Sequence, residues 1–291
     1  MKTQAFPYKE IAPDTYEIGE FDCASIFLLV GGEKAMLIDT GIGIGDLKGF
    51  VRTLTAKPLM VCYTHAHPDH TGGAGAFDHA YLHPNDMPDF ATGGMIGLRM
   101  ETRLGYIRRI AEREKGVYPY NLAEDVTEWG PCPALSPLED LQRIDLGDRV
   151  VTVYVCPGHS PGSITFLDEK THILFLGDAC NCNLHLGGGP RGSQRFTSVE
   201  KALFYLHRLE SLHPKYDHCF NGHYDFRPLG DPLGEDVLPD AITACEQIVA
   251  GTAKAEVRPP LMPNFPSKPV VTIGRTNVSF FSDGIHEDQS P

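Results

Sequence analysis

The sequence contains no uninterrupted run of about 18 apolar residues, the length that a membrane-spanning helix requires. Its first residues also contain no apolar segment of signal-peptide length. Basic side chains are few, since 25 Lys and Arg face 38 Asp and Glu, for a formal net charge of −13. No basic stripe is present to neutralise phosphates, so we expect neither a membrane nor a nucleic-acid partner.

The eight cysteines do not follow the spacing of a disulfide framework. They are scattered along the chain, and most lie inside apolar runs such as "LMVCYTH" and "VVTVYVCPGH". This placement is typical of buried thiols, and with the missing signal segment it predicts a cytoplasmic protein. The 291 residues, 42% of them hydrophobic, are enough for a single domain with a large core.

The apolar pattern predicts strands and helices in alternation. Glycine-bounded strands ("TYEIG", "ASIFLLVGG", "KAMLIDTG") precede a helix ("GDLKGFVRTL") and a buried strand ("PLMVCYTH"). Residues 93–120 have helical spacing, and the acidic, proline-rich residues 121–138 are expected to form a loop. A strand ("DRVVTVYVCPGHS"), a hairpin ("SITFLDEKTHILFLGDAC"), a helix and a further strand ("YDHCFNGHYD") follow. That helix, "TSVEKALFYLHRLESL", has Thr197 and Glu200 at capping-box spacing. A last helix near 235–250 and a hairpin, "PVVTIGRTNVSFFSD", close the chain.

Polar clusters recur where the predicted strands end: "THAHPDH", "PGHSPGS", "LGDAC" and "NGHYD". Loops that leave the same edge of a sheet converge even when they are far apart in sequence. Imidazole and carboxylate groups are ligands of zinc, iron and manganese, and a catalytic site keeps one position open for water. In an extended segment His65 and His67 project to the same side, and the turn after Pro68 lets Asp69 and His70 face a neighbouring ion. The sequence therefore predicts a metal site at this edge.

The motifs "THAHPDHTGG", "PGHSPGS", "FLGDAC" and "NGH", in this order, resemble those of the metallo-β-lactamase superfamily over residues 15 to about 225. The resemblance implies an α/β fold, an αββα four-layer sandwich with two divalent metal ions at one edge of its sheets. Position for position, the residues that resemble the ligands of the first metal are His65, His67 and His159. Those that resemble the ligands of the second are Asp69, His70 and His223, with Asp178 as the carboxylate that bridges both. Asp39, in "LIDTG", resembles an aspartate that orients a ligand or loop without binding metal.

We expect one domain over residues 1–291, with residues 93–138 as a lid-like helical insertion and 255–291 as a C-terminal extension. Candidate apolar side chains that would line the lid are Met95, Met100, Tyr106, Tyr118, Tyr120 and Trp129. Asn181, in "DACNCN", is a candidate for an oxyanion or substrate contact, although a turn role is the commoner one for asparagine. Cys180 and Cys182 are expected to be packing residues.

Two metal ions activate water as hydroxide and polarise the bond to be cleaved, and a free oxygen of Asp69 would orient the nucleophile. The expected activity is metal-dependent hydrolysis of a small-molecule ester, thioester, lactone or related carbonyl compound. Zinc is the expected metal, with iron and manganese as alternatives. A small-molecule phosphodiesterase and a mononuclear-iron enzyme similar to persulfide dioxygenases are the alternative functions, and a homo-oligomer is an open alternative to a monomer.

Overall fold

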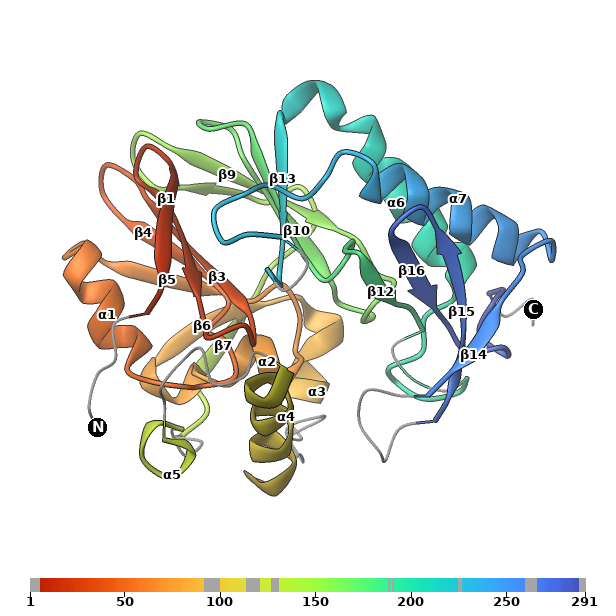
Figure 1. Ribbon diagram of the computed structural model, residues 1–291. Coiled ribbons are helices and arrows are strands. Elements are labelled where there is room, and N and C mark those ends of the chain that lie inside the picture. Colours follow the sequence, from red (N-terminus) through yellow and green to blue (C-terminus); the bar gives the residue numbers. More distant parts are fainter. Residues whose placement is uncertain are drawn as a thin grey trace.

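The computed structural model describes residues 6–91, 100–113, 121–126, 131–187, 189, 191–224, 227–259 and 266–287. Two central β-sheets lie face to face, and helices cover the outer side of each (Figure 1). Within the described ranges, no helix has both the length and the apolar composition needed to cross a bilayer.

The first sheet has seven strands that are hydrogen-bonded in chain order. The strands are β1 Tyr8–Ala12, β2 Thr15–Gly19, β3 Ser25–Val30, β4 Ala35–Ile38, β5 Leu59–Cys62, β6 His79–Leu82 and β7 Ala134–Pro137. Strands β1 to β4 form an antiparallel meander, whereas β5, β6 and β7 continue the sheet in parallel. Helix α1 (Leu47–Leu54) connects β4 to β5, and Asp46 caps it by accepting a hydrogen bond from the Gly49 amide.

The second sheet has five strands in the order β13-β11-β10-β9-β8. Its strands are β8 Arg143–Asp145, β9 Val150–Val155, β10 Ile164–Asp168, β11 Ile173–Gly177 and β13 His218–Asn221. Strands β8 to β11 are antiparallel, and β13 pairs in parallel with β11 after a crossover through helix α6 (Val199–Ser211). The hairpin predicted around residues 164–177 is confirmed as β10 and β11.

Alternation along the strands decides which side chains fill each layer. Phe27 and Leu29 of β3 point into the cluster between the two sheets, whereas Ile26 and Leu28 point to the outer face of the first sheet. On β11, Phe175 points between the sheets in the same way, and its neighbours Leu174 and Leu176 point outward. Both sheets are therefore apolar on both faces, and each needs a cover on its outer side.

Helices supply that cover. Helix α1 and helix α4 (Met100–Arg113) pack on the first sheet through Phe50, Val51, Ile107 and Ile110. Helix α6 and helix α7 (Val237–Val249) pack on the second sheet through Leu206, Leu209, Ile242 and Cys245. The result is the predicted αββα four-layer sandwich. The short helices are α2 Pro68–Thr71, α3 Met87–Ala91 and α5 Leu122–Asp125, with 3-10 turns at Ala74–Ala76, Pro84–Asp86 and His213–Lys215.

A third sheet of four strands, in the order β12-β16-β15-β14, lies beside α7 (Figure 1). Its strands are β12 Asn183–His185, β14 Glu256–Arg258, β15 Lys268–Ile273 and β16 Thr276–Ser279. The hairpin predicted near the C-terminus is β15 and β16, and β16 also pairs in parallel with β12. The described part of the expected C-terminal extension is thus joined by main-chain hydrogen bonds to a strand that follows Asp178.

Two local expectations are wrong. Residues 121–138 do not form only a loop, because Leu122–Asp125 is helical and Ala134–Pro137 pairs with β6. Proline is tolerated in this strand because β7 lies at the edge of the sheet, where main-chain amides on one side of the strand have no neighbouring strand to bond to. Helix α6 is capped by Ser198 in place of Thr197, since the Ser198 hydroxyl accepts a hydrogen bond from the Lys201 amide.

A tertiary contact explains the shifted cap. The carbonyls of Gly284 and Ile285 accept hydrogen bonds from the Val199 and Glu200 amides, which have no partner within the helix. This segment comes from the far end of the chain, so the pattern around Thr197 did not reveal it.

The predicted helix over residues 93–120 is described only as α4. Of the candidate lid side chains, Met95, Tyr118, Tyr120, Trp129 and the side chain of Met100 lie outside the described part of the chain. Tyr106 is partly buried and packs against the cluster on the outer face of the first sheet. The lid role of residues 93–138 stays a prediction.

A buried arginine joins the two sheets. Arg149, just before β9, donates two hydrogen bonds to the carboxylate of Asp168, at 3.0 Å from Nε and 2.6 Å from Nη2. It also donates to the carbonyls of Asp14, in the turn between β1 and β2, and of Val30 in β3. Both charged side chains are fully inaccessible to solvent, so removing one partner would leave the other buried and uncompensated.

We therefore expect Arg149→Met to lower the free energy of unfolding by about 3–5 kcal/mol, the usual cost of breaking a buried pair. Arg143→Met is the matched control, because Arg143 forms a two-bond pair with Glu169 while 62% of its side chain is exposed. That exposed pair should contribute about 1 kcal/mol or less. Urea unfolding measures both variants, and equal losses would contradict the role assigned to Arg149.

Candidate metal centre

Four loops bring the predicted ligands together, and each leaves the C-terminal end of a strand. His65, His67 and the short helix α2 follow β5, and His159 follows β9. Asp178 follows β11, and His223 follows β13. These ends lie at one edge of the paired sheets, because β5 continues the first sheet in parallel and β13 continues the second. All seven residues proposed as ligands meet there.

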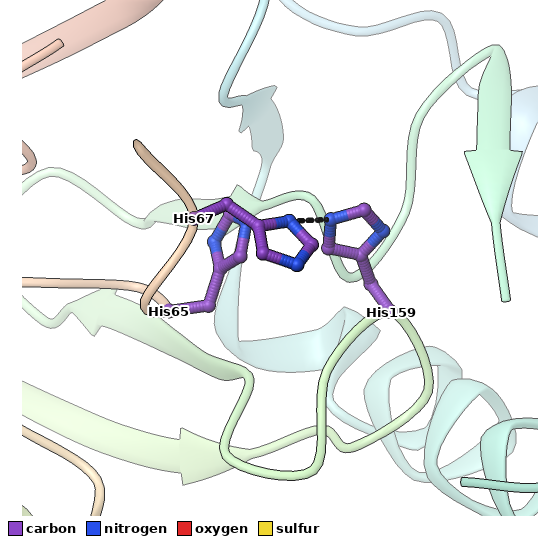
Figure 2. A group of neighbouring side chains, drawn as sticks. All are labelled: His65, His67 and His159. Atoms are coloured by element: carbon purple, nitrogen blue, oxygen red, sulfur yellow. Dashed lines mark hydrogen bonds between the residues drawn. The ribbon is translucent and has the colours of Figure 1, made fainter. Parts of the chain in front are cut away.

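The ligand atoms form three overlapping groups, within each of which the atoms lie no more than 4.8 Å apart. The groups are His65, His67 and His159; His65, His70 and Asp178; and Asp69, His70 and His223. Figure 2 shows the rings of the first group turned toward one another, with His159 Nε2 2.8 Å from His67 Nδ1. The composition of the first and third groups is the one that the resemblance implied for two separate ions.

Asp178 lies between the two sets of histidines. Its Oδ2 is 3.3 Å from His223 Nε2 and 3.6 Å from His159 Nε2, while its Oδ1 is 3.7 Å from His70 Nε2. One carboxylate thus faces ligands of both proposed ions. This is the placement that a bridging role requires.

Several of these atoms are buried without a hydrogen-bond partner, namely His65 Nε2, His70 Nε2 and Asp178 Oδ1. An unsatisfied polar atom in the protein interior costs free energy, so such a concentration at one point needs an explanation. Divalent cations bound here would satisfy all three. The residues therefore fit a metal ion of the kind that imidazole and carboxylate ligands hold, such as zinc, iron or manganese.

The surroundings of the three histidines of the first group favour their neutral, metal-binding form. Burial, followed by the charges of neighbouring histidines, holds the pKa values of His65 and His67 well below the usual range. Burial also lowers the pKa of His159. These imidazoles are neutral near pH 7, which is the protonation state that binds a metal.

The second group contains more negative charge. Burial opposes protonation of His70, but the carboxylates of Asp39, Asp178 and Asp69 outweigh it and hold its pKa well above the usual range. The pKa of His223 is raised to about 9, because the charge and hydrogen bond of Asp178 outweigh burial. Burial also acts against the charge of Asp178, yet His223 and His70 together hold the pKa of this carboxyl well below the usual range. This side of the centre attracts positive charge.

Asp39 contacts His70 directly and His65 through Thr64. It follows β4 with a backbone φ of 63°, and its Oδ2 accepts a hydrogen bond from His70 Nδ1 at 2.8 Å. The same carboxylate accepts hydrogen bonds from the amide and the hydroxyl of Thr64, and the Thr64 hydroxyl lies 3.0 Å from His65 Nδ1. With Nδ1 engaged in this way, Nε2 of each ring is left to face the centre.

Asp86 is a further residue of the site that the sequence analysis did not identify. Its buried carboxylate accepts hydrogen bonds from the amide of Ala66 at 3.0 Å, the hydroxyl of Ser160 at 2.7 Å and the amide of Gly162 at 2.6 Å. Burial raises its pKa to about 6. Ala66 lies between His65 and His67, and Ser160 follows His159, so Asp86 ties together the two loops that carry the first group. The sequence did contain a signal, because "HPND" is another polar cluster at a strand end.

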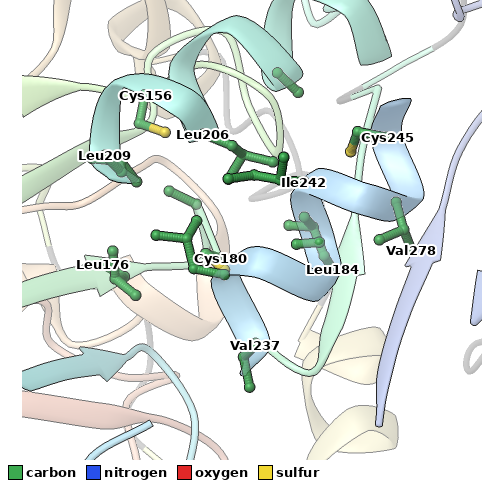
Figure 3. Close-up of a cluster of buried hydrophobic side chains, with 14 of the residues drawn as sticks. Cys156, Leu176, Cys180, Leu184, Leu206, Leu209, Val237, Ile242, Cys245 and Val278 are labelled. Carbon is green, nitrogen blue, oxygen red and sulfur yellow. The ribbon is translucent and has the colours of Figure 1, made fainter. Parts of the chain in front are cut away.

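Asn181 and the cysteines beside it have structural contacts. The side-chain oxygen of Asn181 accepts a hydrogen bond from the Asn183 amide at 2.8 Å, which forms the turn into β12. An oxyanion contact from its amide group stays a prediction. Cys180 lies in the apolar cluster between the second sheet, α6 and α7, where burial holds its pKa well above the usual range (Figure 3). Cys182 belongs to the same cluster, and the described part of the chain contains no disulfide.

The comparison with protein families agrees with this geometry. The family model described as "Metallo-beta-lactamase superfamily" matches residues 20–181, more than half of the chain. The chain belongs to the metallo-beta-lactamase superfamily. This assignment confirms the family that the four motifs indicated.

Curated relatives within the superfamily include enzymes. The acyl-coenzyme A thioesterase MBLAC2 of Bos taurus is 34% identical over 177 residues, which cover 56% of this chain and 60% of the relative. The probable metallo-hydrolase YqgX of Bacillus subtilis is 22% identical over 205 residues, which cover 69% of this chain and 84% of the relative. This chain therefore spans 60% of the length of the thioesterase that it matches.

Solved structures of other proteins share the fold. A metallo-beta-lactamase family protein from Thermus thermophilus aligns with a TM-score of 0.57 at 20% identity, over 83% of this chain and 82% of the other. The sec-alkylsulfatase Pisa1 from Pseudomonas sp. aligns with a TM-score of 0.60 at 17% identity, over 84% of this chain and 42% of the other. At these identities the likeness concerns the architecture alone.

The contacts of Asp39 lead to a prediction about metal affinity. Asp39→Asn keeps the size of the side chain but removes the charge that holds His70, so we expect metal binding to weaken about 10- to 100-fold. The far-ultraviolet circular dichroism spectrum should not change. Asp78→Asn is the control, because Asp78 is exposed. Titration with metal in the presence of a competing chelator measures both variants. An unchanged metal affinity in Asp39→Asn would show that Asp39 only stabilises the turn after β4.

Proposed function

We propose that this protein is a metal-dependent hydrolase that cleaves thioesters of small molecules. The observation that carries the proposal is the position of Asp178, whose carboxylate faces both sets of histidines. One of its oxygens and two of the facing imidazole nitrogens are buried without hydrogen-bond partners. Relatives named as acyl-coenzyme A thioesterases favour the thioester among the carbonyl substrates that such a site would accept.

In this proposal each residue of the site has one role. His65, His67 and His159 would hold one divalent ion, Asp69, His70 and His223 a second, and Asp178 both, with zinc as the proposed metal. When bound, the two ions supply hydroxide near neutral pH and polarise the carbonyl of the substrate. The remaining steps are carried by the side chains of the chain itself.

Asp69 is the carboxylate best placed to handle the proton of the nucleophile. It lies in the first turn of α2, with Oδ2 3.7 Å from His223 Nε2 and Oδ1 4.0 Å from His70 Nε2. Its side chain is 21% exposed, whereas that of Asp178 is 9% exposed. Asp69 thus reaches both the histidines and the solvent side of the site, and we assign it the orientation of the attacking water.

The leaving group of a thioester needs less protonation by a general acid than the leaving group of an oxygen ester. A thiol with a pKa of about 8.5 leaves as thiolate near neutral pH, whereas an alkoxide must be protonated as it departs. A single carboxylate that orients the nucleophile therefore suffices for thioester cleavage. This agrees with a site whose only partly exposed carboxylate among the proposed ligands is Asp69.

A substrate panel combined with metal analysis tests the proposal. The purified protein should contain close to two metal ions per chain and should hydrolyse a thioester faster than a lactone, a β-lactam or a phosphodiester. Removal of metal by a chelator should abolish the activity, and added zinc should restore it. Asp178→Ala should lose much of the bound metal. One iron per chain with no hydrolysis of any substrate would refute the proposal and favour an oxidative reaction.

Asp69→Asn separates proton handling from metal binding, because it preserves the shape of the side chain and removes its basicity. With metal occupancy restored by excess ion, we expect kcat on the thioester to fall about 10² to 10⁴-fold while KM changes little. Steady-state kinetics and metal content should be measured on the same samples. If refilled protein recovers full turnover, Asp69 is a ligand only.

A further inference from the structure

The third sheet has one apolar face and one polar face. Leu184, Val271 and Val278 are adjacent in the strand register and belong to the cluster that packs against α7. Side chains alternate along strands, so the neighbours of these residues project from the other face. His185, Ser279 and Lys268 are placed there, since His185 pairs with Ser279, and Lys268 is two residues from Val270, another partner of Ser279.

The strand that carries His185 is joined to the proposed metal centre by main-chain hydrogen bonds. The carbonyl of His185 accepts a hydrogen bond from His159 Nδ1 at 2.8 Å, and the Gly187 amide donates to the carbonyl of Gly158 at 3.0 Å. The end of β12 is thus fastened to the loop that carries His159. His185, on the polar face, therefore lies next to the loop of a proposed ligand.

A short series of contacts connects Lys268 to the same loop. The Lys268 ammonium lies 3.9 Å from the centroid of the Phe281 ring. That ring packs so closely on Gly187 that a Cβ atom there would lie 2.7 Å from Phe281 Cδ2. Gly187 in turn bonds to Gly158, the residue before His159. Lys268 is therefore separated from a proposed ligand by one aromatic ring and one main-chain segment.

Lys268 differs in its charge balance from three shielded arginines of this chain. Arg149, Arg227 and Arg195 pair with Asp168, Glu17 and Asp89, respectively. Lys268 forms no ion pair with a described residue, and burial lowers its pKa to about 8. A shielded positive charge without a carboxylate partner costs free energy, and a bound anion would offset that cost.

We propose that Lys268 binds an anionic group carried by the thiol half of the substrate, on the polar face of the third sheet next to His185. This inference rests on the proposed thioesterase function. The reacting carbonyl belongs at the histidine cluster, whereas Lys268 lies beyond Phe281 and Gly187. The anionic group must accordingly be separated from the cleaved bond by a linker, which would run along the Phe281 ring.

The shared chemistry of the substrate class is a thioester with a remote negative charge. A phosphate, as in coenzyme A, and a carboxylate, as in glutathione, both meet this description. An ammonium ion forms charge-assisted hydrogen bonds with either group. A neutral thioester such as S-acetyl-N-acetylcysteamine offers the same bond to be cleaved and no group for Lys268.

The test compares acetyl-coenzyme A, S-acetylglutathione and S-acetyl-N-acetylcysteamine as substrates of the metal-loaded protein. Lys268→Met should raise KM for at least one anionic thioester about 10- to 100-fold, the range of a hydrogen bond to a charged group, with kcat nearly unchanged. The KM for the neutral thioester should not change, and Lys268→Arg should restore most of the loss. Lys254→Met is the matched control, since Lys254 is exposed. The anionic substrate that is affected identifies the group as phosphate or carboxylate.

Equal loss on charged and neutral thioesters would overturn the inference, because it would indicate a structural role for Lys268. No loss on any substrate would overturn it as well. If the wild-type protein hydrolyses none of the three thioesters, the proposed function fails separately. Calorimetric titration with S-methyl-coenzyme A and S-methylglutathione then decides the anion site, since Lys268→Met must still weaken binding of one of them. Binding that is absent in the wild type or equal in the variant would refute the site.

Discussion

The buried, unpaired ligand atoms at the sheet edge are the constraint on which the rest of the structure depends. His65 Nε2, His70 Nε2 and Asp178 Oδ1 have no hydrogen-bond partner, although each is removed from water. Such an arrangement is costly in a folded chain unless a cation compensates it, so metal binding and the stability of this edge are expected to be coupled. The αββα layers make the arrangement attainable, because strand ends from both sheets meet there and the packed faces hold them in place.

Buried carboxylates fix the loops around this edge. Asp39 and Asp86 hold the loops that carry the histidines, and Glu20 accepts hydrogen bonds from the amides of Gly43 and Ile44 after β4. Glu17 accepts two hydrogen bonds from Arg227, which also donates to Asn221, two residues before His223. Hydrogen bonds to charged groups are stronger than neutral ones, and several of them around one site limit how far the ligand loops move.

Sequence patterns predicted most of the strands well, because each is a short apolar run bounded by glycine or polar residues, and the family resemblance implied the four layers. The expectations failed where a distant segment decides the local structure. Residues 134–137 form a strand because β6 offers an open edge, and α6 begins after Ser198 because Gly284 and Ile285 supply carbonyls to its first turn. Asp86 was missed for the same reason. Its partners Ala66 and Ser160 lie 20 and 74 residues away, so its neighbours in sequence do not reveal its contacts.

The sequence by itself determined the family, the short apolar runs that form strands buried on both faces, and the clusters of histidine and aspartate at strand ends. These features are local, and each is visible in a few consecutive residues. Only the tertiary structure decided that Asp178 faces both sets of histidines, that Asp39 bonds to His70, and that Lys268 comes close to the loop of His159 without a carboxylate partner among the described residues. Such facts depend on the distances between segments far apart in the chain, which packing sets and no local pattern encodes.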